Sequence, residues 1–351
     1  MRTLVYAATG AACGEVKAPG LDSNPSAVDA REGEPDGGVG DAAPDAAPEP
    51  CRVTYAVLNP PTGSAHDVYT SLIDGSGEVN VSTDSADDFG PRFARTGRLL
   101  YLTTRDAREV WTSGPRGEDA RRVVASAQFA AWSRDGARLA IGRMDGLYVT
   151  SADGLVEAKV SDKAPAGPPE FSPDDRAVVF QAFDGDIYSV PVGGGPTVNL
   201  TQTPGVSEHG PTYSPDGGRI AFSRVSDTMK PDIWTMTASG GDAANLTAGS
   251  PKGDTSPLWG PDGWIYFSSE REGAYRVFRI PEGGGVAHRV TDNAGTGFRA
   301  GDDPVDVSRD GVLLFERDHE RVGIVRTDGT GLRLLDAVPA RAGNLSCGVA
   351  L

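Results

Sequence analysis

The sequence has few of the residue types that build most catalytic and metal centres. Its 351 residues include 4 His, 3 Cys and 4 Met, and aromatic residues make up 7%. Basic residues number 33 against 49 acidic ones, so we expect no nucleic-acid partner, because phosphate binding needs a basic surface. No apolar run reaches 18 residues, so we expect no transmembrane helix. The abundant residues are instead Gly (46) and Pro (26), which favour short strands joined by tight turns.

Motifs that carry known chemistry are also missing. The chain has no Gly-x-Ser-x-Gly elbow, no Walker loop, no His-Glu-x-x-His and no Cys-x-x-Cys. Asp184-Gly185-Asp186 comes nearest to a calcium loop, but the spaced Asp ligands and terminal Glu of such a loop are absent, so turn chemistry explains it. The four histidines fall in different repeats: His66, His209, His288 and His319. We therefore expect no metal and no cofactor.

The first 13 residues resemble a bacterial lipoprotein signal. Arg2 precedes an apolar stretch, Leu4–Ala12, and small residues lead into Cys13. The pattern departs from the usual one in having Gly10 where a leucine is common. The resemblance implies that Cys13 is lipidated and that the protein meets a membrane only through this anchor. The alternative is an unprocessed terminus in which the cysteine is incidental.

Residues 14–50 have the composition of a disordered tether. They include nine acidic and two basic residues, six prolines and no aromatic residue. Such a segment buries too little apolar surface to offset the entropy lost on ordering. We expect a spacer between a lipid anchor and a folded domain over residues 51–351.

The rest of the chain consists of repeats of about 40 residues, each with three recurring motifs. The first motif is an aromatic residue, Ser or Gly, Pro or Arg, Asp, Gly or Asp, and then an apolar run. It reads WSRDGARLAI, FSPDDRAVVF, YSPDGGRIAF and WGPDGWIYF, with weaker copies FARTGRLLYL and VSRDGVLLF. The second motif places an aromatic or aliphatic residue at Tyr69, Trp111, Tyr148, Tyr188, Trp234, Phe278 and Ile324. The third is centred on Val81, Val124, Val160, Leu200, Leu246, Val290 and Leu334.

Each repeat thus holds four short segments with the strand signature of β-branched or aromatic residues bounded by turn formers. Asp-Gly pairs such as Asp135-Gly136 and Asp216-Gly217 follow the first segment and predict two-residue hairpins. Units of four antiparallel strands at this period predict an all-β fold, the β-propeller. A solenoid is the structural alternative, although its repeats usually carry a helix or a shorter period.

The motifs resemble the WD40-like PD40 repeats of the TolB-like propeller family, whose consensus runs Ser-Pro-Asp-Gly, Asp-Ile-Tyr/Trp and Leu-Thr. The resemblance covers about residues 52–351 and is strongest over 171–247. It implies a propeller fold. In TolB itself a folded α/β domain precedes the propeller, whereas here the acidic tether does. We therefore do not expect the Tol-system role.

The motif counts predict seven blades. The first motif occurs six times and the other two occur seven times, so residues 52–85 lack a first strand. One further repeat step from Val307 leads to residues 344–351, which would supply that strand and close the ring. The same arrangement predicts a Cys51–Cys347 disulfide, although two unrelated thiols are the alternative. Six blades would result if residues 52–85 packed as an extension.

The loop lengths distinguish the two faces of the propeller. Loops between strands one and two, and three and four, are tight turns, whereas those on the other face are longer and irregular. Binding usually lies on variable loops over a rigid scaffold. We expect the ligand face there, with these candidates ahead of the first strands: Asp88, Phe89, His209, Asp254, Arg299, Asp302 and Asp303. The four aspartates predict an acidic channel mouth that prefers a cationic partner in a salt-sensitive way.

Three classes of function fit these observations. The first is a non-catalytic, monomeric module of the cell envelope, periplasmic, on the outer membrane or secreted, that binds a protein or peptide at the channel mouth. The second is a propeller enzyme, such as a lyase or glycosidase, because paired carboxylates like Asp302 and Asp303 can perform acid–base work. A third is the propeller part of a peptidase. The fold alone does not decide among them.

Overall fold

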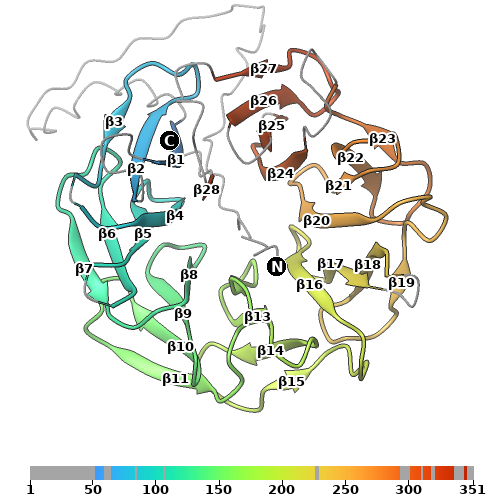
Figure 1. Cartoon of the computed structure of the whole chain (residues 1–351). Helices are drawn as coiled ribbons and strands as arrows, with labels where there is room; N and C mark the ends of the chain where they lie inside the picture. Colours follow the sequence, from blue (N-terminus) through green and yellow to red (C-terminus); the bar gives the residue numbers. More distant parts are fainter. Residues whose placement is uncertain are drawn as a thin grey trace, which may run out of the picture.

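The computed structural model describes residues 52–58, 65–83, 85–105, 107–225, 229–292, 301–309, 311–317 and 321–335, and the backbone of 344–345. These residues form seven sheets of four antiparallel strands arranged around a central channel (Figure 1). The predicted seven-bladed propeller is confirmed, and the six-bladed alternative is wrong. Within this described part, no helical segment has the length and apolar character that a membrane crossing requires.

The strands follow the predicted repeats blade by blade. Blade 1 contains β28 (Asn344–Leu345), β1 (Arg52–Leu58), β2 (His66–Leu72) and β3 (Val79–Asn80). Blade 2 contains β4 (Asp88–Phe93), β5 (Leu99–Thr103), β6 (Glu109–Ser113) and β7 (Arg121–Val124). Blade 3 contains β8 (Phe129–Trp132), β9 (Arg138–Arg143), β10 (Gly146–Ser151) and β11 (Glu157–Ser161). Blade 4 contains β12 (Glu170–Phe171), β13 (Ala177–Gln181), β14 (Ile187–Pro191) and β15 (Val198–Asn199).

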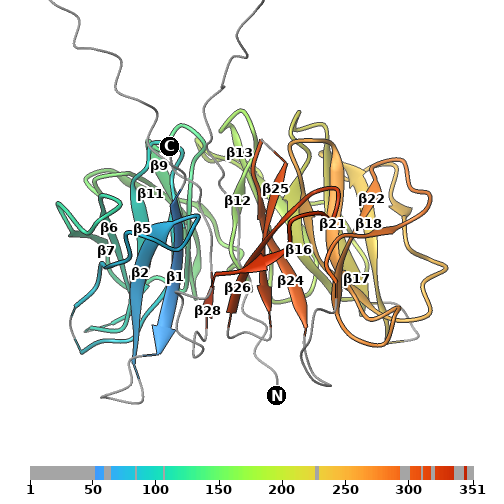
Figure 2. The ribbon, with the colours of Figure 1, turned by 90° about the horizontal axis from the view of Figure 1, so that it is seen from above.

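The last three blades repeat this order. Blade 5 contains β16 (Glu208–Tyr213), β17 (Arg219–Val225), β18 (Pro231–Thr237) and β19 (Ala244–Asn245). Blade 6 contains β20 (Asp254–Trp259), β21 (Trp264–Ser269), β22 (Arg276–Pro281) and β23 (His288–Arg289). Blade 7 contains β24 (Asp302–Val307), β25 (Val312–Arg317), β26 (Arg321–Arg326) and β27 (Arg333–Leu334). Seen from the side, the sheets stand around the axis (Figure 2).

Blade 1 is built from both ends of the chain. Strand β28 pairs antiparallel with β1, with Tyr55 opposite Leu345 and Ala56 opposite Asn344. The composite blade that the motif counts predict is therefore present. Cys51 and Cys347 lie outside the described residues, so their disulfide stays a prediction. Cys13 and the 14–50 segment also lie outside them.

An apolar cluster closes the ring between the first and last blades. Val53, Tyr55 and Val57 of β1 pack with Val305 and Leu314 of blade 7. Arg333 Nη2 also donates to the carbonyl of Ile73 across this junction, at 3.0 Å. Because each fully buried side chain of this kind contributes roughly 1.5–3 kcal/mol, the junction holds the two chain ends in one fold.

The second and third motifs hold each other in register. In blade 4, Asn199 Nδ2 donates to Asp186 Oδ2 at 2.6 Å. The hydroxyl of Thr201 accepts from the N–H of Ile187 at 3.0 Å. The Asn–Asp bond recurs in blades 1 and 5, as Asn80–Asp67 and Asn245–Asp232. The Asn-x-Ser/Thr triplets therefore join strands three and four of a blade.

The Asp-Gly turns are longer than the two residues predicted. In blade 3 the closing pair is Ser133 with Arg138, because the Ser133 N–H donates to the Arg138 carbonyl at 2.9 Å. Gly136 has the expected positive φ of 69°. The Asp135 carboxylate accepts from the Ser133 hydroxyl at 2.6 Å and from the Ala137 N–H at 2.9 Å. The aspartate is thus used within the turn, as turn chemistry predicts.

Candidate functional site

Three of the predicted ligand-face aspartates lie at the start of an innermost strand. Asp88, Asp254 and Asp302 are the first residues of β4, β20 and β24, and each has no exposed surface. Glu208 holds the same position in β16 and is equally buried. The carboxylates therefore point away from solvent.

Arginines from the second strands or the loops after them neutralise three of these carboxylates. Asp302 binds Arg317 through two hydrogen bonds, and Asp254 binds Arg271 through two more, at 3.1 and 3.0 Å. Glu208 pairs with Arg224 at 3.0 Å. The expected contribution of Asp254 and Asp302 to an exposed acidic mouth is thus wrong, because buried, paired carboxylates add little negative charge to a surface. Ligand contact by the candidate residues stays a prediction.

The other candidates on this face are more accessible. Phe89, His209 and Asp303 are half-buried, and Arg299 lies outside the described residues. His209 Nε2 is 3.0 Å from the Ser207 hydroxyl, and its Nδ1 is 3.3 Å from Gln181 Oε1. Burial lowers the pKa of His209, which favours the neutral ring. Asp303 is hydrogen-bonded to the hydroxyl of Ser268.

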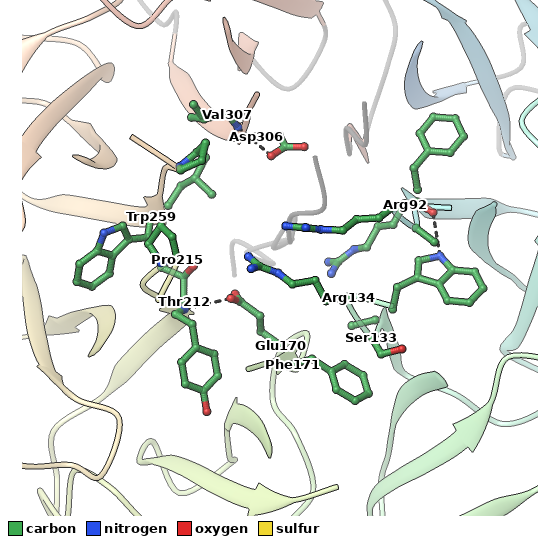
Figure 3. A pocket seen from close by; sticks show the side chains of 18 of the residues that line it. Arg92, Ser133, Arg134, Glu170, Phe171, Thr212, Pro215, Trp259, Asp306 and Val307 are labelled. Atoms are coloured by element: carbon green, nitrogen blue, oxygen red, sulfur yellow. Dashed lines mark hydrogen bonds between the residues drawn. The ribbon is translucent and has the colours of Figure 1, made fainter. Parts of the chain in front are cut away.

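The cavity of the described structure lies at the opposite end of the channel, on the tight-turn face. It forms where the innermost strands of blades 2 to 7 end and their first turns begin, and its volume is about 120 Å³. Figure 3 shows Arg92 and Arg134 extending into it, with Glu170 and Asp306 on other sides. The turn face, which the loop lengths did not favour, therefore carries a pocket lined by residues of six blades.

One repeated position gives this cavity its charge. The third residue of the first motif is Pro215 in blade 5 and Pro261 in blade 6, but Arg95, Arg134 and Arg309 in blades 2, 3 and 7. All five line the cavity. The first motif has Pro or Arg at this position, and its spacing alone does not show that the side chains meet. The replacement of proline by arginine in three turns was the signal that could have located the site.

The arginines crowd one another. Burial lowers the pKa of Arg95, and the positive charges of Arg134 and Arg309 lower it further. Burial also lowers the pKa of Arg134, and Arg309 adds to that effect. Among the described residues, the guanidinium groups of these three arginines have no hydrogen bond or ion pair. The deeper Arg92 is buried, which lowers its pKa to about 10, so it also stays cationic at neutral pH.

Two carboxyl groups share the cavity and are shifted toward neutrality. Desolvation raises the pKa of Glu170 to about 7, although it accepts a hydrogen bond from the Tyr213 N–H at 3.0 Å. Desolvation also raises the pKa of Asp306 to about 7. Asp306 Oδ1 accepts from the Val307 N–H at 2.8 Å, whereas its buried Oδ2 has no partner among the described residues. With four arginines against two such carboxyls, the cavity is positively charged.

Asp175 of blade 4 fixes the turn that presents Arg134. Its carboxylate accepts from the N–H groups of Arg134 and Asp135, at 2.6 and 2.9 Å. Asp175 stands where other first motifs have glycine and has a φ of +57°, a conformation that costs a non-glycine residue about 1 kcal/mol. The two hydrogen bonds to the neighbouring blade offset that strain.

No group of three or more His, Cys, Asp or Glu side chains suited to a metal ion occurs in the part of the chain that the structure describes. The charged groups that line the cavity are its arginines and two carboxyls. Such a set can bind an anion, and its carboxyls can exchange protons near neutral pH.

A family model described as the TolB beta propeller domain, PD40, matches residues 146–337. This range spans more than half of the chain and includes the second half of blade 3 and all of blades 4 to 7. A comparison with the curated proteins finds no match.

Solved structures of several kinds are similar in fold. TolB from Acinetobacter baumannii has 17% identity and a TM-score of 0.53, covering 81% of this chain and 79% of that one. Oligogalacturonate lyase from Vibrio parahaemolyticus has 11% identity and a TM-score of 0.58, covering 80% and 84%. Puromycin hydrolase has 15% identity and a TM-score of 0.64, covering 83% of this chain and 52% of that enzyme. At these identities the likeness shows a shared fold.

Proposed function

The chain belongs to the TolB β-propeller family, and on that premise we propose that it is a non-catalytic module of the cell envelope that binds a protein or peptide at its axial channel. The observation that carries this proposal is the cavity at the turn end of the channel. Its wall presents Arg95, Arg134 and Arg309, whose guanidinium groups have no partner among the described residues. Arg95 and Arg134 are half-buried and Arg309 is exposed, and unpaired guanidinium groups at a cavity wall are suited to a ligand that supplies the missing acceptors.

The scaffold supports binding because it holds the cavity wall rigidly. The lining residues come from six blades, and buried apolar clusters join neighbouring blades, as between blades 4 and 5. A preorganised wall lowers the entropy that a ligand loses on binding. The lipoprotein-like Cys13 and the acidic 14–50 segment support a tethered position at the envelope.

Site-specific crosslinking tests this proposal. A photoreactive amino acid replaces Pro261 at the cavity wall or, as a control on the same face, Arg176, whose side chain is 87% exposed and does not line the cavity. We expect one envelope protein or peptide to form an adduct from position 261 and none from 176. Identical adducts from both positions, or none from 261, would contradict the proposal.

A second candidate function is acid–base catalysis in the same cavity. The observation that favours it is the pair Glu170 and Asp306, whose pKa values of about 7 suit proton transfer at neutral pH. A structural neighbour is an oligogalacturonate lyase, so acidic oligosaccharides are the first substrates to test. Turnover that is lost in Glu170→Gln while binding persists would establish this function, and no turnover by wild-type protein would exclude it for these substrates.

A further inference from the structure

We propose that the turn-face cavity is a carboxylate site in which Arg95, Arg134 and Arg309 together bind an acidic side chain or the terminal carboxylate of a peptide. This inference rests on the proposed function, because it names the chemistry of the ligand taken at the same channel mouth. The cationic partner expected from the sequence concerned the loop-face mouth at the other end of the channel, so the two expectations refer to different sites.

The first support is the arrangement of the three arginines. Equivalent turns of blades 7, 2 and 3 project them into one cavity, close enough for the positive charges of Arg134 and Arg309 to lower the pKa of Arg95. Bringing like charges together is unfavourable unless a counter-charge joins them. A carboxylate provides that charge and accepts paired hydrogen bonds from the planar guanidinium group.

The second support is the asymmetry of the wall. Blades 5 and 6 contribute Pro215, Leu258 and Pro261, so an apolar side faces the basic one. The cavity of about 120 Å³ corresponds to the liquid volume of about four waters. That volume suits a carboxylate with a short aliphatic stem, whose methylene groups would pack on the proline side while the oxygens meet the arginines.

The third support is that hydrogen bonds within the protein hold the basic side of the cavity in place. Asp175 adopts a strained backbone conformation and uses its carboxylate on the turn of Arg134, although Arg134 has no such partner for its own guanidinium group. Asp306 Oδ2 is buried beside the cavity without a donor among the described residues. A protonated Asp306 could donate from this oxygen to a bound carboxylate.

Two sources can supply the acidic peptide. One is a separate protein. The other is the chain itself, whose residues 14–50 include nine acidic and two basic residues. The chemistry is the same in both cases, so the experiment separates the two sources.

The test is a titration of full-length protein with a fluorescent tetraglutamate peptide, with tetraglutamine as the uncharged control. We expect tetraglutamate to bind in 50 mM salt, tetraglutamine to bind at least tenfold more weakly, and the difference to shrink in 500 mM salt. Arg134→Gln should weaken tetraglutamate binding at least tenfold. Arg309→Gln should do the same, and because Arg309 is exposed this variant keeps the fold intact.

The matched control is Arg176→Gln, which removes an exposed arginine from the same face. Unchanged tetraglutamate binding in this variant, with weaker binding in the other two, supports the site. Equal binding of the two peptides, or equal loss in all three variants, would overturn it. A channel crosslink that forms as strongly with Arg134→Gln and Arg309→Gln as with wild type would refute the carboxylate site and leave the proposed function standing.

A second arm identifies the source. The nine acidic residues of 14–50 are replaced by their amides in the full-length chain. Tighter tetraglutamate binding by this variant would show that the segment competes for the cavity in cis, whereas unchanged binding would assign the site to a separate peptide. Loss of binding in this variant would contradict the proposed site, since the arginines are intact.

The pH dependence offers an independent readout. Four arginines and two carboxyl groups face the cavity: Arg92, Arg95, Arg134, Arg309, Glu170 and Asp306. Asp175 lies beside them. Glu170 and Asp306 take up protons as the pH falls from 8 to 6, while the arginines and tetraglutamate keep their charge. Tetraglutamate should therefore bind more tightly at pH 6, and Glu170→Gln should reduce this pH effect.

Discussion

Asp302 and Arg317 form a buried, two-point ion pair across the first two strands of blade 7. Asp302 Oδ1 lies 2.7 Å from Arg317 Nε, and Oδ2 lies 2.9 Å from Nη2. The residues are 0% and 2% exposed. The Arg317 guanidinium also lies 5.2 Å from the centre of the Phe315 ring. Related pairs in blades 5 and 6 make this a repeated structural device of the loop face.

We expect Arg317→Gln to destabilise the protein by about 3–5 kcal/mol, because it leaves the Asp302 charge buried without its partner. Denaturant unfolding measures the change. The control is Arg176→Gln, which removes one partner of the exposed Arg176–Asp174 pair and should change the free energy of unfolding by less than about 0.5 kcal/mol. Similar small effects for both variants would show that the buried pair is not structural.

Asp306→Asn should stabilise the protein at pH 8. Desolvation raises the pKa of Asp306 to about 7, so between about pH 4 and 7 the folded chain keeps a proton that the unfolded chain has lost. The free energy of unfolding of the wild type therefore falls as the pH rises through this window. Each pKa unit corresponds to about 1.4 kcal/mol. We therefore expect Asp306→Asn to raise the free energy of unfolding by at least about 1 kcal/mol at pH 8.

The same Asp306→Asn variant should differ much less from wild type at pH 4, because the folded carboxyl is protonated there and the unfolded one, with an ordinary pKa of 3.8, is only about half ionised. Unfolding curves at pH 4 and pH 8, without added peptide, give the comparison. Asp216→Asn is the control, because hydrogen bonds from Ser214 and Gly218 lower the pKa of this turn residue. That variant should lose stability at pH 8. A gain for Asp216→Asn, or a loss for Asp306→Asn, would contradict the assignment.

The disulfide prediction follows from the composite blade. If Cys51 and Cys347 are bonded, reduction should lower the free energy of unfolding by several kcal/mol, with about 5–6 kcal/mol as an upper figure for a loop of roughly 300 residues. Unfolding with and without reductant tests this, and Cys51→Ser with Cys347→Ser is the non-bonded control. Two reactive thiols in the oxidised, exported protein would disprove the bond.

The anchoring prediction concerns Cys13. If it is lipidated, Cys13→Ser should move the protein from the membrane fraction to the soluble fraction, because a single polar substitution removes the acyl chains. Incorporation of labelled fatty acid into the wild type is the direct measurement. Wild-type protein without label would show that the cysteine is incidental.

The sequence determined the fold because each blade of a propeller is specified by short motifs that are close together in the chain. Turn residues at fixed steps and alternating apolar strands specify each blade by itself, and counting the motifs was enough to predict seven blades and the closing role of residues 344–345. The Asp-Gly pairs predicted the positions of the turns correctly but their lengths wrongly. The turns are longer because the Asp135 side chain adds its own hydrogen bonds to the loop.

Tertiary structure alone decided the charge of the two channel ends. Asp254 and Asp302 seemed to be exposed acids until their arginine partners, 15 or more residues away, were seen to bury and neutralise them. Arg95, Arg134 and Arg309 are separated by whole repeats and come together only because the sheets close into a ring. Burial and charge pairing depend on which distant residues meet, and that information exists only in the folded chain.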